Sequence, residues 1–283
     1  RETGVPLVPV EERPAPQAGA VPGEHLSPTQ PVPTSATYVL QRPRLTDADM
    51  WGFTFWDRDK CRDLLHRYRY EGAFSPPSLE GTITYPDNLG VMNWGSAAID
   101  PVRHLLIINT SHVATIAQLV PRAQADARFA RGEWILAQQG TPYAAAWTPM
   151  LSPWGAPCNK PPWGELVAID LKAGKRLWQV PLGTTRDLAP WPLWLKLGTP
   201  NIGGPLVTAS GLTFIGATTD DFLRAFDSAT GRELWKGRLP AGPQATPMTY
   251  RLGPGGKQFV VIAAGGHKYM RTKLGDYLVA FSL

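Results

Sequence analysis

The segment AIDLKAGKRLW (Ala168–Trp178) returns as AFDSATGRELW (Ala225–Trp235), and this repeat decides the fold class. The copies share Ala, Asp, Gly, Leu and Trp in register, and 57 residues separate their tryptophans. The aspartates can accept backbone N–H groups and begin a turn, and the glycines can supply its positive φ. Alternation then places the Leu and the Trp on opposite faces of a new strand. The repeat therefore predicts strand, turn and strand, with a Trp that packs between successive sheets.

The rest of the chain supports an all-β fold. Its 28 Gly, 29 Pro and 11 Trp among 283 residues are typical of short strands joined by tight turns, and 43% apolar residues are enough for a packed core. A unit of about 57 residues matches a generous four-stranded propeller blade, since blade repeats run from about 40 to 50 residues. A sandwich would not need this repetition. We therefore expect a β-propeller.

Three regions are expected along the chain. Residues 1–50 are rich in proline and predict an extended segment laid over a surface. Residues 51–80 form a helix-containing insertion, in which Asp57 or Asp59 caps a helix that carries Cys61, Leu64, Leu65 and Tyr68 on one face. Residues 81–283 hold the blades, with an insertion at about 122–163 that contains clusters of Pro and Trp.

The beginning of the chain matches part of the repeat. Arg1-Glu2-Thr3-Gly4 aligns with Ser228-Ala229-Thr230-Gly231, so the sequence begins one residue after the turn aspartate of another copy. A strand that starts in mid-hairpin would leave an unpaired edge. We therefore expect the chain to be part of a propeller.

Charge and cysteine content exclude several functions. The 28 Lys and Arg against 23 Asp and Glu give a net charge of +5, but the basic residues are scattered, which argues against a nucleic-acid surface. Cys61 and Cys158 form no C-x-x-C motif, so a thiolate metal site is not expected. They are either a disulfide or two buried thiols. No apolar run reaches the ~18 residues of a membrane span and no signal peptide is recognisable, so either the protein is cytoplasmic or its targeting signal lies on sequence outside this chain.

Nine segments together resemble one family, the membrane-bound dehydrogenases of the glucose, quinate and shikimate group that depend on pyrroloquinoline quinone (PQQ). They follow one another over nearly the whole chain: EERPAP, PGEHLSPTQP, DADMWG, RYEGAFSPPS, GTITYPDNLGVMNWGSAAIDP, QLVPRAQ, CNKPPWG, LPAGPQATPMTY and AAGGHKYMRTKLGDYLVAF.

The resemblance implies an architecture and an activity. In the family, an amino-terminal membrane domain precedes an eight-bladed propeller on the periplasmic face of the bacterial inner membrane, and this chain would supply roughly the carboxy-terminal half of that propeller. The family oxidises glucose, a related aldose or a cyclic polyol, reduces PQQ and passes electrons to ubiquinone, while Ca²⁺ or Mg²⁺ polarises the quinone. Glucose or a related aldose, oxidised to the lactone, is the expected substrate. Quinate or shikimate is the alternative.

The resemblance also implies which residues lie near PQQ. Asn93 matches a family Asn that contacts the quinone, although a turn Asn that bonds its own backbone is the alternative. Trp94 would present an aromatic wall to the cofactor or fill a blade interface. His267 would lie near the substrate, with a purely structural histidine as the alternative. Asp220 would maintain the site, with a turn carboxylate as the alternative. The catalytic base and the metal ligands are expected upstream of Arg1, so this chain alone is expected to be inactive.

One position differs from related soluble quinoproteins, and one function without catalysis is a rival to the dehydrogenase. Related soluble alcohol-oxidising quinoproteins have a Trp where this chain has Ile202, which favours the sugar and cyclic-polyol branch. A propeller scaffold without catalytic activity would share the Trp repeat but would not need the long proline-rich insertions. The periplasmic setting that the resemblance implies favours a disulfide between Cys61 and Cys158.

Overall fold

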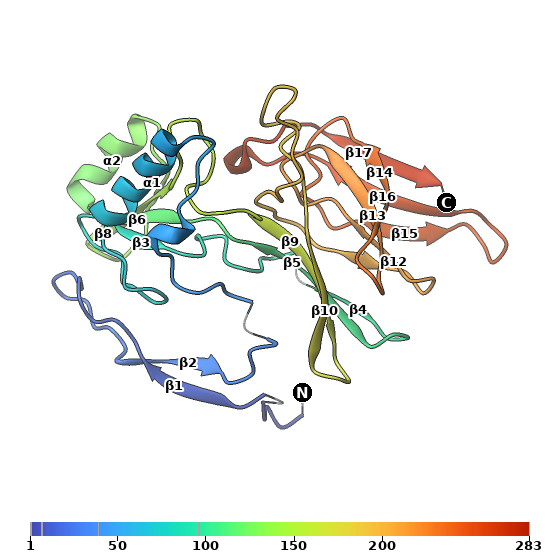
Figure 1. The fold of residues 1–283 in the computed structure, drawn as a ribbon, viewed down its shortest axis with the longest axis horizontal. Helices are drawn as coiled ribbons and strands as arrows, with labels where there is room; N and C mark the ends of the chain where they lie inside the picture. The colour runs from blue at the N-terminus through green and yellow to red at the C-terminus, as the bar shows by residue number, and fades with distance from the viewer. Residues whose placement is uncertain (1, 7, 39, 96, 283) are drawn as a thin grey trace. The chain divides into compact units, whose positions relative to one another are not determined.

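The computed structural model describes residues 2–6, 8–38, 40–95 and 97–282, which form two compact units (Figure 1). The first unit contains Arg1–Asn88 and Val113–Lys160, and the second contains Leu89–His112 and Pro161–Leu283. Each unit is therefore built from two separate stretches of sequence. The expected all-β fold is confirmed, because strands make up most of the regular structure.

The second unit contains three antiparallel sheets, each with its strands in sequence order. Their bounds are β4 Ala97–Asp100, β5 Leu105–Ser111, β9 Gly164–Asp170 and β10 Lys175–Pro181; β11 Leu206–Val207, β12 Leu212–Ile215, β13 Phe222–Asp227 and β14 Glu233–Arg238; and β15 Met248–Arg251, β16 Gln258–Ala264 and β17 Tyr277–Ser282. A short 3-10 helix, η2 (Lys268–Met270), lies between the last two strands.

Apolar side chains hold successive sheets of this unit together. Leu166 and Leu182 of the first sheet and its following loop pack with Phe226 of the second. Leu223 of the second sheet packs with Val260 and Ile262 of the third. Each sheet thus contributes side chains to the core on the face that it turns toward its neighbour, as expected for stacked blades.

The repeated turns have the predicted chemistry. Asp170 Oδ1 accepts from the backbone N–H groups of the residues two and three positions later, at 2.8 and 2.9 Å, and Asp227 does the same at 2.9 Å for both bonds. Gly174 and Gly231 adopt φ values of 60° and 71°, as predicted. Gly4 has a φ of 70°, in agreement with its alignment to Gly231, whereas Arg1 lies outside the described residues.

A β-bulge that the sequence analysis did not predict places each repeat tryptophan. In the β9–β10 pair the register shifts between Arg176 and Trp178, so that Trp178 faces Ala168. In the β13–β14 pair it shifts at the same place, and Trp235 faces Ala225. Because Ala is small, each ring has room to reach the next sheet.

The first unit combines a hairpin, a four-stranded sheet and the helices. Its elements are β1 Val10–Pro14 and β2 Thr29–Pro33 in the hairpin; β3 Thr82–Thr84, β6 Thr115–Pro121, β8 Tyr143–Pro149 and β7 Ile135–Leu136 in the sheet; and η1 Asp47–Asp49, α1 Phe55–Arg67 and α2 Arg122–Ala130. The sequence analysis predicted one helix, α1. It missed α2, whose nine residues begin directly after Pro121 and are too few to show a clear helical period.

The cap of α1 differs from the prediction. Thr54 is the N-cap, and Asp57 is the third residue of a capping box, in which its Oδ1 accepts from Thr54 N at 2.6 Å. Asp59 instead pairs with Arg62 on the surface. The predicted buried face is confirmed: Cys61 and Leu65 are buried, and Leu64 and Tyr68 pack against the same core.

The structure joins Cys61 to Cys158 in a disulfide. This bond links α1 to the end of the stretch that returns to the second unit, across a sequence separation of 97 residues. Among the described residues, no helix has the length and apolar character required to cross a bilayer.

Candidate functional site

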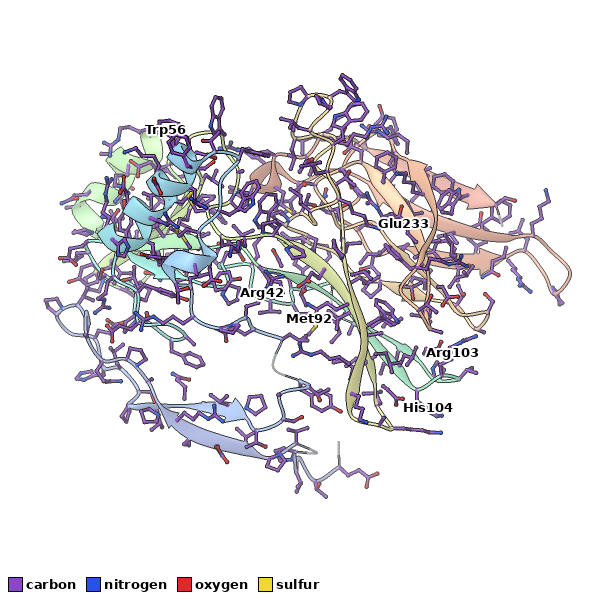
Figure 2. The ribbon with its side chains drawn as sticks, viewed as in Figure 1. Arg42, Trp56, Met92, Arg103, His104 and Glu233 are labelled. Carbon is purple, nitrogen blue, oxygen red and sulfur yellow. A yellow bond between two sulfur atoms is a disulfide. The ribbon has the colours of Figure 1, made fainter. Side chains whose placement is uncertain are left out.

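The direction of the strands gathers the candidate residues at one end of the second unit. Antiparallel strands that follow one another alternate in direction. The loops that lead into β4, β11 and β15 therefore lie at the same end as the β5–β9, β12–β13 and β16–β17 connections. Figure 2 shows the two ends of the first sheet. Met92 precedes β4 at one end, and Arg103 and His104, between β4 and β5, lie at the opposite end. Asn93, Trp94, Asp220 and His267 all belong to loops of the Met92 end.

Two buried asparagines connect the first sheet to the second. The Nδ2 atom of Asn109, on β5, donates to Asn201 Oδ1 at 2.7 Å and to the carbonyl oxygen of Gly203 at 3.1 Å. In return, Asn201 Nδ2 donates to the carbonyl oxygen of Thr110 at 2.8 Å. Both asparagines are buried, so these bonds fix the loop that leads into β11.

The Asn93–Gly95 turn lies directly against that loop. A Cβ atom at Gly95 would come within 1.8 Å of the carbonyl oxygen of Gly203, so only glycine permits this approach. Asn93 uses its side chain locally: Nδ2 donates to the carbonyl oxygen of Leu89, and Oδ1 accepts from Trp94 N at 2.7 Å. The Trp94 side chain is 62% exposed. Asn93 therefore shapes the turn, and the turn presents the Trp94 ring.

Asp220 is a buried anchor of the β12–β13 loop. Its carboxylate accepts from Arg224 Nη1 at 2.9 Å, from Thr218 Oγ1 at 2.6 Å and from Thr184 N at 2.8 Å, and a second Arg224 bond completes a bidentate ion pair. Burial by itself would raise the pKa of Asp220, but the hydrogen bonds and charge of Arg224 outweigh it, and the pKa is lowered. Asp220 is therefore ionised at neutral pH, and it positions two loops.

His267 belongs to a hydrogen-bonded chain that crosses from the third sheet to the second. Its backbone N–H donates to Thr272 Oγ1 at 2.7 Å, and this hydroxyl donates to Gln244 Oε1 at 2.9 Å. Gln244 Nε2 then donates to the carbonyl oxygen of Thr218 at 2.7 Å, next to Asp220. The structure thus brings His267 and Asp220 into one polar network.

Several buried polar atoms around these loops have no hydrogen-bond partner among the described residues. They are Asn109 Oδ1, Ser111 Oγ, Thr219 Oγ1 and His267 Nδ1. Leaving such an atom unpaired costs about 1–3 kcal/mol. The carboxylate and quinone oxygens of PQQ are complementary to three of these atoms, the two hydroxyls and the imidazole nitrogen, which can donate, whereas Asn109 Oδ1 can only accept. The residues of this end therefore fit PQQ. The same fit is not seen for the divalent ion. The described residues contain no group of three or more His, Cys, Asp or Glu that could hold it.

Much of this network is not predicted from the sequence. In the segment Asn201–Gly204 only Ile202 carries a sequence-based expectation, and Asn109, Gln244 and Arg224 carry none. A signal was present for two of them. Asn109 directly follows the apolar run Leu105–Ile108 of β5, and Arg224 lies within the apolar run of β13, four residues after Asp220.

Comparisons with known proteins agree on one family. A family model described as "PQQ: Glucose/ethanol/alcohol dehydrogenase, beta-propeller domain" matches residues 1–260. All of the chain aligns with the quinoprotein glucose dehydrogenase of Escherichia coli (strain K12) at 43% identity, with the glycerol dehydrogenase large subunit of Gluconobacter thailandicus at 44%, and with the quinate/shikimate dehydrogenase (quinone) of Acinetobacter baylyi at 39%. The chain spans 36%, 40% and 36% of the lengths of these three relatives.

Proposed function

Because the chain belongs to the family of PQQ β-propeller domains of glucose, ethanol and alcohol dehydrogenases, we propose that it forms part of the cofactor and substrate site of a PQQ-dependent dehydrogenase. The substrate is glucose or a related aldose, which is oxidised to the lactone. The observation that carries the proposal is the set of unpaired buried polar atoms at the end of the second unit where Asn93, Asp220 and His267 lie.

In the proposed reaction, the residues of this chain bind and position the cofactor and the substrate. PQQ, when bound, would supply the two-electron acceptor for oxidation of the substrate. The Trp94 ring would form a wall of the cofactor site, and Asn93 holds the turn that presents this ring. Asp220 and Arg224 fix the β12–β13 loop, and His267 contacts the substrate or the cofactor through its imidazole. The catalytic base and the metal ligands belong to other parts of the protein.

Quinate or shikimate is the alternative substrate. Relatives that are glucose, glycerol and quinate/shikimate dehydrogenases match the chain at 39–44% identity, so overall similarity does not separate the substrates. The full-length protein, reconstituted with PQQ and Ca²⁺, should reduce an artificial dye faster with glucose than with quinate. Strong activity with quinate and none with glucose would reverse this order.

A propeller scaffold without catalytic activity is the alternative from another class. Equilibrium binding of PQQ to the full-length protein separates it from the proposed enzyme, because undetectable binding at micromolar PQQ would support a scaffold. A Trp94→Ala variant tests the contact itself. Loss of an aromatic wall should weaken PQQ binding about tenfold, whereas Trp154→Ala, which removes a ring that is 67% exposed, should leave it unchanged. Equal affinities of Trp94→Ala and the unchanged protein would contradict the assignment of Trp94.

The proposed location is the periplasmic face of the bacterial inner membrane, with ubiquinone as the electron acceptor. The Cys61–Cys158 disulfide supports this, because disulfides persist in oxidising compartments such as the periplasm. The membrane anchor and the remaining blades would be supplied by the rest of the same polypeptide. Labelling of intact cells with a reagent that does not cross the inner membrane tests the location, and protection of this chain from such a reagent would contradict it.

A further inference from the structure

An apolar loop is exposed between β10 and β11. Its sequence from Asp187 to Leu195 is DLAPWPLWL, and its large apolar side chains are exposed: Leu188, Trp191, Leu193, Trp194 and Leu195. Trp191 is 75% exposed. Scattered exposed apolar residues are normal on a protein surface, but five within eight consecutive positions mark an interaction surface.

The backbone of this loop is closed on itself by Thr185. Thr185 N donates to the carbonyl oxygen of Leu195 at 3.1 Å, and Leu195 N donates to Thr185 Oγ1 at 2.8 Å. The carbonyl oxygen of Thr185 also accepts from Leu188 N at 3.0 Å and from Ala189 N at 2.9 Å. The loop therefore has a fixed neck, and it displays its apolar side chains in a defined arrangement.

The tip of the loop has few polar groups that need water. Pro190 and Pro192 have no backbone N–H, and Leu193 N donates to the carbonyl oxygen of Pro190 at 2.9 Å. Trp194 Nε1 donates to the carbonyl oxygen of Ala189 at 3.0 Å. A protein partner can satisfy free donors, whereas lipid cannot. Internal pairing of this kind is therefore suited to a lipid environment.

Charges at the base of the loop suit an anionic lipid surface. The Arg186 guanidinium lies 4.6 Å from the centre of the Trp194 ring. The one acidic residue of the loop, Asp187, is paired with Arg238 at 2.6 Å, and Lys196, which follows the last exposed leucine, is paired with Glu233 at 3.2 Å. Trp rings favour the headgroup region, and an Arg next to them can reach lipid phosphates.

We propose that the loop Thr185–Leu195 inserts its apolar side chains into the boundary between headgroups and acyl chains of an anionic bilayer. The loop lies at the same end of the second unit as the candidate site, and Thr184, at its base, donates to Asp220 at 2.8 Å. The loop would therefore hold that end of the sheets at the membrane surface. This inference goes beyond the proposed function and does not depend on it, because it uses neither PQQ nor a substrate.

A site-specific probe tests the insertion. Both native cysteines are in the disulfide, so a cysteine introduced by Leu193→Cys gives a single position for a fluorescent label on the full 283-residue chain. Vesicles of phosphatidylcholine and phosphatidylglycerol in equal parts carry a nitroxide quencher high on the acyl chain. The label at 193 should be quenched at least about twofold more than a label introduced by Leu252→Cys, a position that is 88% exposed at the opposite end of the unit. Equal quenching at the two positions would overturn the proposal.

Partition of the unlabelled chain into the same vesicles gives an independent measurement. Trp191→Ser should lower the partition coefficient about fivefold, and Trp154→Ser, which removes a ring of similar exposure from the first unit, should leave it unchanged. Circular dichroism confirms that each variant is folded. Partition of Trp191→Ser equal to that of the unchanged chain would overturn the proposal. The proposal would also be overturned if the chain self-associated without vesicles and Trp191→Ser abolished this self-association, because the loop would then bind a second copy of the chain.

Discussion

The indole ring of Trp178 lies against the backbone of Gly231 in the next sheet, so closely that a Cβ at Gly231 would stand 2.6 Å from the ring. Trp178 Nε1 also donates to the carbonyl oxygen of Ser228 in the same turn, at 3.1 Å. The turn glycine of one repeat thus receives the tryptophan of the preceding one. Trp235 makes a comparable contact with the third sheet, where its ring lies edge-on to Phe281 with centroids 5.0 Å apart.

Removal of the Trp178 ring should destabilise the second unit. Trp178→Ala should lower the free energy of unfolding by about 3 kcal/mol, and Trp178→Phe, which retains a ring but loses the N–H donor, by about 1 kcal/mol. Urea unfolding followed by circular dichroism measures both. Trp154→Ala is the control, since its exposed ring should contribute less than about 0.5 kcal/mol. Equal stabilities of the two alanine variants would show that the ring does not join the sheets.

A methyl group at Gly95 should disturb the candidate site. Gly95→Ala forces the Asn93–Gly95 turn away from Gly203, and overpacking of this kind costs about 1–3 kcal/mol. The midpoint of urea unfolding should fall, and PQQ should bind more weakly to the full-length variant. Gly255→Ala is a matched control, because a Cβ there has no heavy atom within 4 Å. Wild-type PQQ affinity in Gly95→Ala would place the cofactor away from this turn.

Loss of the Asp220 charge should destabilise the protein most at neutral pH. Asp220→Asn removes the buried, bidentate counterion of Arg224 and leaves only Glu233, at 3.8 Å, at a cost of about 3–5 kcal/mol. Since the pKa of Asp220 is lowered from its ordinary 3.8, the ion pair stabilises the fold above that value and is lost as the pH falls below it. Urea unfolding should therefore show that the difference in the free energy of unfolding between the unchanged protein and Asp220→Asn becomes smaller from neutral to acidic pH. Asp59→Asn, which breaks an exposed pair, should cost less than about 1 kcal/mol throughout.

The neighbouring Asp221 should show the opposite trend. Burial, together with the charge of Asp187, raises the pKa of Asp221. Its protonated form therefore stabilises the fold at low pH, and this contribution is lost as the pH rises through the raised pKa. Asn is neutral at every pH, so the stability of Asp221→Asn relative to the unchanged protein should increase from acidic to neutral pH. Urea unfolding over the same pH range measures this relative stability. If the relative stabilities of Asp221→Asn and Asp220→Asn changed in the same direction with pH, the opposite directions of the two pKa shifts would be refuted.

Loss of the disulfide should weaken the first unit. A crosslink that closes a loop of about 100 residues stabilises a fold by roughly 4–5 kcal/mol in the chain-entropy model. The double variant Cys61→Ala/Cys158→Ala should unfold at lower urea, and reductant should shift the midpoint of the unchanged protein but not that of the variant. Intact-mass measurement shows the bond directly, because reduction adds two hydrogens. Two free thiols in the unreduced protein would contradict the structure.

The local chemistry of the repeat could be predicted from sequence because it depends on neighbouring residues. Asp227 and Gly231 lie four positions apart, and the turn between them needs only their own side chain and backbone. The bulge at Leu177 and Leu234 was missed, because an extra residue in one strand is defined only by its pairing with the other. The N-cap at Thr54 was not predicted for a related reason. Thr54 and Asp57 bond each other reciprocally, and the sequence alone does not show which of the two is the N-cap.

The candidate site was predictable residue by residue but not as a network. Asn93 and His267 were selected by resemblance, and the structure places them in loops at one end of the strands. The bond from Asn109 to Asn201 spans 92 positions, and no pattern in either segment specifies it. It follows from the stacking of one sheet on the next. Contacts of this kind require the positions of the sheets before the partners of a polar side chain can be known.

The strand order around the insertion also bears on how the chain folds during synthesis. Ser111 at the end of β5 pairs with Gly164 at the start of β9, and the residues that follow and precede them meet again where His112 N donates to the carbonyl oxygen of Trp163 at 2.8 Å. All of Val113–Lys160 is therefore enclosed by a single strand pairing. On the ribosome, β5 can pair at once with β4, which precedes it, but its other edge has no partner until β9 is made after the inserted stretch. Because its two ends meet, a change in the length of the inserted stretch would leave the register of β5 and β9 unchanged.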